Sequence, residues 1–150
     1  SGLGEDAAYL AAQGYRVIAF DISGSAIDTA RRRFPTSPVD FRVADLLNPP
    51  PEWRHHFDFV VETYTTQALP VRLRPTVVLH VGRFVAPGGI LLVLAAARDA
   101  GDPVNGPPWP LTPDDIESFA VEGLETVSVE EIRDPPGTHR WRAVFTRPRR

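Results

Sequence analysis

The sequence predicts a single α/β domain with a mostly parallel sheet. The order of its segments predicts the fold class, and its length and composition predict one domain. Short apolar or alternating segments, typical of strands, alternate with segments whose apolar residues recur at helical spacing. This alternation is typical of β-α-β units, in which helices connect parallel strands. The 150 residues are 43% hydrophobic and 23% charged, so we expect one domain with a single core.

Six segments are predicted to be strands. Each is a short apolar or alternating run between turn residues, and the last two flank a turn over residues 134–137 that suits an antiparallel hairpin. The predicted strands cover residues 15–20, 39–43, 57–61, 90–95, 126–132 and 141–145.

Four helices are predicted between or before these strands. Ser23 or Ser25 can cap the second helix, and apolar residues at helical spacing predict one long helix over residues 69–85. Thr112 precedes Pro113, which suits the first helical position, so a short helix is expected there. Residues 98–110 are rich in Pro, Gly and Asp and are predicted to form a loop.

Composition narrows the class of protein. A net charge of −3 and a pI near 5.8 argue against nucleic-acid binding, and the arginines at 31–33 and in the tail 147–150 are expected to complement a helix dipole and to be solvated. The chain has no cysteine, which excludes disulfides and thiolate nucleophiles. No apolar run suits a membrane span, so we expect a cytoplasmic protein without a membrane partner.

Two glycines and a later acid predict a ligand site near the start of the chain. Gly2 and Gly4 precede a helix, and Asp21 ends the following strand, 17 residues after Gly4. Glycines let a ligand approach the backbone closely, and a carboxylate at that spacing can accept hydrogen bonds from both hydroxyls of a ribose. The pattern Gly-x-Gly-x-x-Ala over residues 2–7 also fits a dinucleotide site.

The order of segments resembles class I S-adenosylmethionine-dependent methyltransferases over nearly the whole chain. The segments that carry the resemblance are Gly2-Leu3-Gly4, Phe20-Asp21-Ile22-Ser23, Val43-Ala44-Asp45-Leu46, Phe57 to Glu62, and Ala86 to Leu92. The resemblance implies a Rossmann-like sheet of order 3-2-1-4-5-7-6 that ends in an antiparallel hairpin. The family's first strand has no counterpart here, so we expect residues 1–150 to be one methyltransferase domain that is incomplete at its N-terminus.

The same resemblance implies S-adenosylmethionine as the cofactor and assigns seven residues to it. The residues are Gly2 and Gly4 at the methionine moiety, Asp21 at the ribose, Ile22 and Asp45 with the Leu46 backbone at the adenine, and Glu62 at the end of the strand beside the methyl group.

Charge favours this cofactor over a dinucleotide. Glu5 and Asp6 stand at the start of the first helix, where they would repel a pyrophosphate, whereas S-adenosylmethionine has no phosphate. The two acids would also suit simple helix-dipole compensation, which favours neither ligand. An NAD(P)-dependent oxidoreductase and a non-enzymatic binding protein on a methyltransferase fold therefore stay open as alternatives.

The acceptor is expected to be a small molecule. Gln67 to Pro70 and Gly106 to Trp109 are similar to segments of the thiopurine methyltransferase-like and tellurite-resistance-like branch, whose members act on small molecules. The residues expected to line the acceptor pocket follow strand ends or lie in the long loop: Tyr64, Arg98, Asp99 and Trp109.

No catalytic base is assigned, and no metal site is predicted because no cluster of metal-ligand residues is evident. His55 and His56 precede a strand, at the end of the sheet away from the ligand, while His139 lies in the edge hairpin. His80 has the spacing of a residue packed within a helix. The sequence does not predict an oligomeric state.

Overall fold

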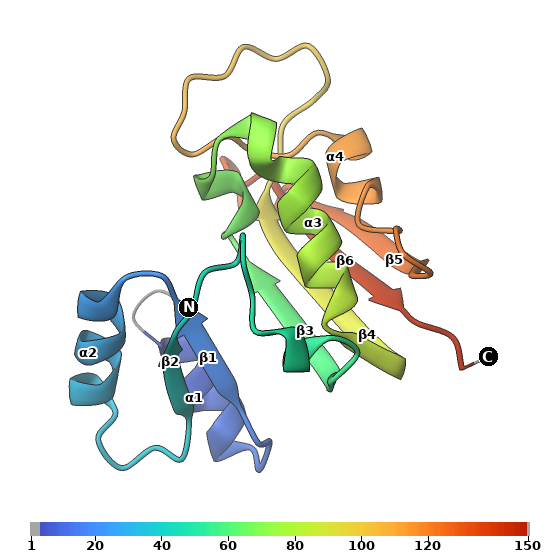
Figure 1. Ribbon diagram of the computed structural model, residues 1–150. Helices are drawn as coiled ribbons and strands as arrows, with labels where there is room; N and C mark the ends of the chain where they lie inside the picture. Colours follow the sequence, from blue (N-terminus) through green and yellow to red (C-terminus); the bar gives the residue numbers. More distant parts are fainter. Residues whose placement is uncertain (1–3, 150) are drawn as a thin grey trace. The chain divides into compact units, whose positions relative to one another are not determined.

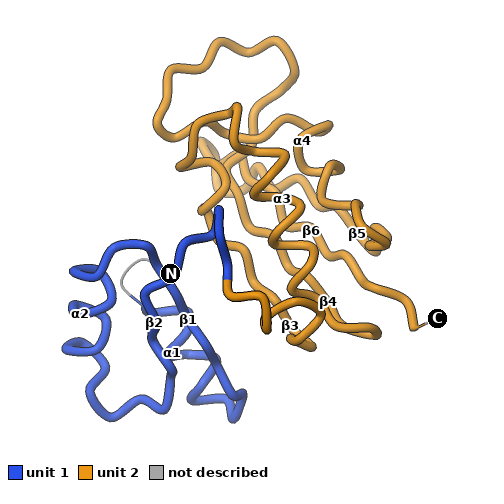
Figure 2. The backbone as a smooth tube through the Cα atoms, viewed as in Figure 1, with its two compact units in different colours: residues 1–49 blue, residues 50–150 orange. Residues whose placement is uncertain are grey.

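The computed structural model describes residues 4–149 and confirms the predicted α/β class. The chain forms two compact units, residues 1–49 and residues 50–150 (Figure 2). Within residues 4–149, none of the helices combines the length and the apolar character that crossing a membrane would require.

The first unit is a β-α-β motif preceded by a helix (Figure 1). Its elements are α1 (Glu5–Ala12), β1 (Ile18–Asp21), α2 (Gly24–Arg33) and β2 (Asp40–Val43). The two strands pair in parallel, and the Ser23 hydroxyl caps α2 by accepting from the Ala26 N–H at 3.2 Å. Apolar side chains of all four elements and of Val39 form the core: Ala11, Ala19, Ile27, Ala30, Val39 and Phe41.

The second unit is built on a four-stranded mixed sheet in the order β3-β4-β6-β5. Its elements are the 3-10 turns η1 (Pro51–Trp53), η2 (Thr66–Ala68) and η3 (Val71–Leu73), the helices α3 (Arg74–Arg83) and α4 (Pro113–Glu117), and the strands β3 (Phe57–Thr63), β4 (Val85–Ala96), β5 (Glu125–Ile132) and β6 (Arg140–Thr146). β3 and β4 are parallel, whereas β6 is antiparallel to both β4 and β5. The predicted C-terminal hairpin is therefore confirmed.

One face of this sheet carries the core of the second unit. Alternate residues of β4 are buried, and each lies opposite a buried residue of β6: Leu91 and Phe145, Val93 and Ala143, Ala95 and Trp141. The helix α3 crosses β4 on this face (Figure 1). Phe119, just beyond α4, packs against Phe145 with ring centroids 6.0 Å apart.

The long helix predicted over residues 69–85 is wrong at both ends. Proline has no N–H and fits only the first turn of a helix, so α3 begins at Arg74, directly before Pro75, after two short 3-10 turns. At the other end Val85 already belongs to β4, where it pairs with Phe57. Residues 86–89 then bulge out of the ladder, which resumes at Ile90 opposite Phe59.

The first arginine of the tail, Arg147, is not solvated as the sequence suggests, whereas Arg149 is exposed as expected. Arg147 is buried, and its guanidinium donates to the carbonyl oxygens of Val85 at 2.8 Å, Gly82 at 3.0 Å and Glu122. It therefore fastens the end of the chain to the segment that joins α3 and β4. The run at 31–33 does occupy the last turn of α2, as predicted.

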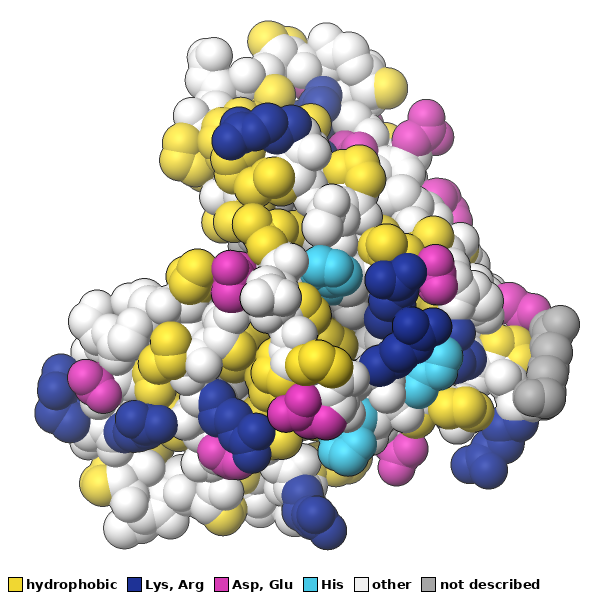
Figure 3. Space-filling view, in the orientation of Figure 1, with side chains coloured by type: hydrophobic (Ala, Val, Ile, Leu, Met, Phe, Trp, Pro, Cys, Tyr) yellow, Lys and Arg dark blue, Asp and Glu magenta, His cyan; other side chains and the backbone are white. Residues whose placement is uncertain are grey.

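On the face of the protein drawn in Figure 3, positively and negatively charged side chains are interspersed. Several charged side chains pair at the surface: Arg33 with Glu5, Arg42 with Asp40, Arg83 with Glu122, and Arg142 with Glu130. Such exposed pairs contribute little to stability, about 0 to 1 kcal/mol each.

Candidate functional site

Two predicted ligand-binding acids lie at the same edge of the first unit. The register places Asp21 at the end of β1 opposite Val43, and the Ala44 N–H donates to the Asp21 carbonyl at 3.0 Å, so Asp45 follows at once. Each carboxylate also shapes its own turn, because Asp21 accepts from the Ser23 N–H and Asp45 from the Leu47 N–H, both at 2.9 Å. The parallel pairing thus brings together two acids that stand 24 residues apart.

Apolar side chains accompany these acids. Ile22 directly follows Asp21 and is 68% exposed, and Val43 at the end of β2 is 57% exposed. Leu46 is half-buried beside Asp45. Exposed branched side chains next to two carboxylates can cover the face of a heterocycle whose polar groups the acids bind.

Gly4 is fixed in place by both its backbone and its surroundings. It caps the start of α1 with a φ of 86°, in the left-handed region that favours glycine. A Cβ built there would lie 2.9 Å from Phe41 Cε1 and 3.1 Å from Ala30 Cβ. The backbone of Gly4 therefore packs directly on the core. Gly2 lies outside the described residues.

The two acids at the start of α1 are not equivalent. Glu5 forms an ion pair with Arg33 at 2.8 Å, so part of its charge is neutralised within the unit. Asp6 is exposed in the same first turn. Glu5 would therefore repel a pyrophosphate less strongly than Asp6 would.

In the second unit, Glu62 lies near the end of β3 and is almost fully buried. Its Oε1 accepts from the N–H groups of Thr65 at 2.6 Å and Thr66 at 3.1 Å, and its Oε2 has no hydrogen-bond partner among the described residues. Burial raises the pKa of this carboxyl, and the hydrogen bonds from Thr65 and Thr66 only partly offset that effect. The strand end thus holds a buried acid that binds a proton more tightly than an exposed glutamate does.

Buried polar side chains gather next to this acid. Four of the five buried polar or charged residues of the described chain lie between residues 62 and 74: Glu62, Thr66, Gln67 and Arg74. Gln67 joins this segment to β4 and to the loop 98–110, because its Oε1 accepts from the Ala96 N–H at 2.6 Å and its carbonyl accepts from the Trp109 N–H at 2.7 Å. The sequence alone assigns no role to Arg74 and marks Gln67 only as part of a segment that resembles the small-molecule branch, because neither residue type nor spacing reveals that the two side chains are buried.

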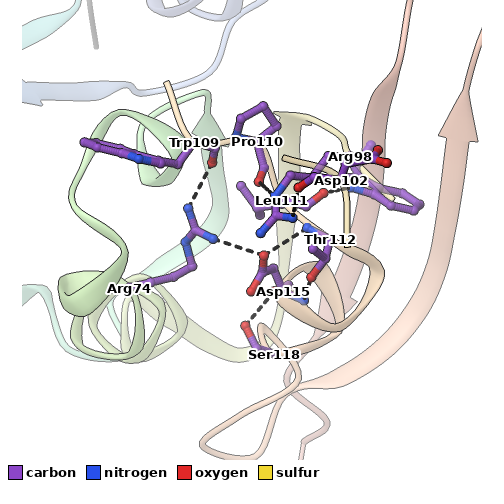
Figure 4. Close-up of polar contacts among 10 residues, drawn as sticks. Arg74, Arg98, Asp102, Trp109, Pro110, Leu111, Thr112, Asp115 and Ser118 are labelled. Atoms are coloured by element: carbon purple, nitrogen blue, oxygen red, sulfur yellow. Dashed lines mark hydrogen bonds and ion pairs between the residues drawn. The ribbon is translucent and has the colours of Figure 1, made fainter. Parts of the chain in front are cut away.

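The two charged residues predicted to line the acceptor pocket are engaged by the protein itself. Arg98 donates to the carbonyl oxygens of Pro110 at 3.1 Å and Asp102 at 3.2 Å, and so closes the loop on itself (Figure 4). Asp99 is exposed and pairs with Arg133 of the hairpin at 3.3 Å.

The two predicted aromatic residues are arranged differently. Tyr64 is 39% exposed, has a φ of 57°, and donates its N–H to the Leu94 carbonyl at 2.8 Å. A non-glycine residue at positive φ is uncommon, and such strain recurs at ligand sites. The indole ring of Trp109 packs on Gly106, where a Cβ would overlap it.

One group of possible metal ligands lies in the described part of the chain. Side-chain atoms of Asp99, Glu131 and His139 lie within 4.8 Å of one another. The Arg133 guanidinium, however, donates to Glu131 at 2.6 Å and to Asp99 at 3.3 Å, and His139 contacts Glu131 at 2.8 Å. The arrangement is an ion-pair network between the hairpin and the start of the loop.

A family model described as a methyltransferase domain matches residues 1–89. No curated protein matches the chain. Among solved structures, a TehB-like methyltransferase from Corynebacterium glutamicum is 24% identical with a TM-score of 0.74, over 97% of this chain and 76% of that one.

Two further solved structures resemble the chain in fold. The 1,6-didemethyltoxoflavin-N1-methyltransferase of Burkholderia thailandensis is 17% identical with a TM-score of 0.76, over 98% of this chain and 68% of that one. The geranyl diphosphate C-methyltransferase of Streptomyces coelicolor is 13% identical with a TM-score of 0.80, over 97% and 68%. Since the family model matches more than half of the sequence, the chain belongs to the methyltransferase domain family and is an enzyme of the S-adenosylmethionine-dependent methyltransferase fold.

Proposed function

We propose that the enzyme transfers a methyl group from S-adenosylmethionine to a small-molecule acceptor. S-Adenosylmethionine is the cofactor of this family. The observation that carries the proposal is the meeting of Asp21 and Asp45 at one edge of the first unit, beside the exposed side chain of Ile22. A carboxylate suits a ribose diol, and an acid beside an apolar side chain suits adenine.

The residues of the first unit fit this cofactor. Gly4, with its positive φ at the start of α1, would present its backbone to the ligand. Asp21 would accept from the ribose hydroxyls. Ile22 would cover the adenine, whose edge Asp45 and the Leu46 backbone would bind. When bound, the cofactor supplies a methyl group on a sulfonium that an acceptor can displace in line. Gly2 and Glu62 complete the proposed set.

We assign the contacts with the acceptor to Tyr64 and Trp109. We propose that Arg98 and Asp99 hold the loop beside the acceptor in place. Because the two charged residues bond within their own loop and hairpin, the aromatic side chains are the groups left to contact an acceptor. This favours an acceptor with a neutral aromatic or apolar face. One structural neighbour, the methyltransferase from Burkholderia thailandensis, is described with bound 1,6-didemethyltoxoflavin and S-adenosylhomocysteine.

The two sheets also support the family's strand order. In the first unit β1 pairs with β2, as strands 2 and 3 do in the family order 3-2-1-4-5-7-6. In the second unit the order β3-β4-β6-β5 corresponds to strands 4-5-7-6 of that order. The family model runs through residue 49, where the two units divide, and this supports a single methyltransferase domain. Direct hydrogen bonds between β1 and β3, detected by NMR across the strands, would contradict the order.

Calorimetric titration separates this proposal from its alternatives. We expect S-adenosylhomocysteine to bind and NAD to show no heat of binding. Asp21→Asn keeps an oxygen for the Ser23 N–H but loses the charge toward the ribose, and should weaken binding by about 1 to 3 kcal/mol. Asp28→Asn, an exposed acid of α2 that contacts Arg31 at 3.7 Å, is the matched control and should leave affinity unchanged.

The titration has two contrary outcomes. Tight NAD binding without S-adenosylhomocysteine binding would indicate an oxidoreductase. Binding of neither compound would favour a non-enzymatic protein on this fold.

The acceptor class is tested by release of S-adenosylhomocysteine from a panel of compounds. Thiophenol, phenol and benzylamine compare the acceptor atom on a common ring, and 2-mercaptoethanesulfonate offers a charged thiol without a ring. We expect turnover of at least one of the aromatic compounds to exceed that of the sulfonate, whereas the reverse order would remove Tyr64 and Trp109 from the acceptor site.

A further inference from the structure

The buried residue Arg74 connects three separate segments of the second unit. It is the first residue of α3 and is 6% exposed. Its NH1 group donates to Asp115 Oδ2 at 3.0 Å and its NH2 group to the Trp109 carbonyl at 2.9 Å (Figure 4). The two prongs of one guanidinium thus reach the loop 98–110 and α4 at the same time.

Asp115 ties this contact to the start of α4. The Oδ2 atom that accepts from Arg74 also accepts from the Thr112 N–H at 2.9 Å, while the Thr112 hydroxyl accepts from the Asp115 N–H at 3.2 Å. This capping box fixes the segment that follows the loop. Arg74 therefore bonds a carboxylate that is already held in place.

The Trp109 backbone is held from both sides by the segment that follows β3. Its N–H donates to the Gln67 carbonyl at 2.7 Å and its carbonyl accepts from Arg74. The position of Trp109 is therefore set by η2 and α3, the elements that follow the Glu62 strand end. The loop's own Arg98 bonds the next carbonyl, that of Pro110.

Stability alone does not call for an arginine at this position. A buried ion pair often contributes no more to stability than an apolar side chain of similar volume, because both charges lose their hydration. The Arg74 Nε atom is buried and has no hydrogen-bond partner within residues 4–149, which adds to that cost. What the guanidinium adds is direction, since two donors at a fixed angle determine where the Trp109 carbonyl lies.

We propose that Arg74 is a positioning residue for acceptor binding, which acts by fixing Trp109 through its backbone carbonyl. The inference rests on the proposed function, in which Trp109 contacts the acceptor. If so, the loss of Arg74 should weaken binding of the acceptor and leave binding of the cofactor at the first unit unchanged.

The test compares Arg74→Lys and Arg74→Met with a control on the same helix, Arg83→Met, which removes an ion pair to Glu122 away from the loop. Kinetics use the panel compound that wild type methylates fastest. We expect both Arg74 variants to raise the KM for that acceptor about tenfold, equivalent to about 1.4 kcal/mol, with little change in kcat or in the KM for S-adenosylmethionine. Hydrogen exchange of the Trp109 amide should accelerate in both variants, and the control should match wild type.

The lysine variant distinguishes positioning from simple support of the fold. Lysine keeps the positive charge that pairs with Asp115, but its single nitrogen replaces the two arginine nitrogens that bond Asp115 and the Trp109 carbonyl. The Arg74→Lys variant should therefore fold like wild type and still show the raised KM for the acceptor. Full recovery by lysine, or a normal acceptor KM and normal Trp109 exchange in Arg74→Met, would overturn the inference. Absence of turnover by wild type would instead overturn the proposed function, and the exchange of Trp109 would still report on its contact with Arg74.

Discussion

At the scale of single residues, Gly4 shows how the start of a helix can depend on the absence of a side chain. Gly4→Ala should lower the free energy of unfolding by more than the roughly 1 to 2 kcal/mol of a left-handed alanine, because its Cβ would also press on Phe41. Urea unfolding measures this. Gly14→Ala is the matched control, with a φ of 96° and open space around it, so it should show the backbone cost alone.

The raised pKa of Glu62 leads us to expect that its contribution to stability falls with rising pH. An acid whose pKa is lowered by folding shows the opposite dependence. Because burial raises its pKa in the folded chain above the ordinary 4.5, the folded state binds the proton more tightly than the unfolded state does. Its contribution to the free energy of unfolding should therefore fall as the pH rises from about 4.5 through the raised pKa. Asp40, Glu130 and Glu131, whose pKa values are lowered by arginine or histidine partners, act in the other direction.

The measurement compares urea unfolding of wild type and Glu62→Gln between pH 4 and 8. Glutamine keeps an oxygen for the Thr65 and Thr66 N–H groups. We expect the stability of wild type relative to the variant to fall as pH rises. A difference that grows with pH would contradict the account of Glu62.

At the scale of elements, the start of α4 depends on its capping box. Thr112→Ala removes the hydroxyl that accepts from the Asp115 N–H and should cost about 0.5 to 2 kcal/mol in the free energy of unfolding. Ser118→Ala on the same helix removes an exposed hydroxyl that donates to the Asp115 carbonyl, leaves the box intact, and serves as the control. Equal effects of the two changes would indicate that the box adds nothing.

Elements with a local signal were predictable from the sequence. The caps at Ser23 and Thr112 and the hairpin around residues 134–137 follow from turn and capping chemistry, which depends on neighbouring residues alone. The helix predicted over 69–85 extended too far at both ends, because apolar residues four positions apart continue from before Pro75 into the following strand. Periodicity does not reveal that β4 begins at Val85, since that depends on pairing with Phe57.

The site followed the same division. The spacing of Gly4, Asp21 and Asp45 could be recognised in the sequence because a parallel β-α-β motif brings the ends of successive strands together. That Arg98 and Asp99 bond within the protein, and that Arg74 reaches Trp109, depends on contacts between residues that lie 12, 34 and 35 positions apart. No local pattern encodes such contacts.

At the scale of the whole molecule, our central proposal is that S-adenosylmethionine binds at Gly4 and at the strand ends of the first unit that carry Asp21 and Asp45, with Glu62 of the second unit in the proposed set. Hydrogen exchange of the full chain with and without S-adenosylhomocysteine tests it most directly, with NAD as the comparison ligand. We predict slower exchange at residues 4–6, 21–24, 44–47 and 62–66 with S-adenosylhomocysteine and no change with NAD. Unchanged exchange at these segments despite binding of the ligand, or protection by NAD alone, would contradict the account.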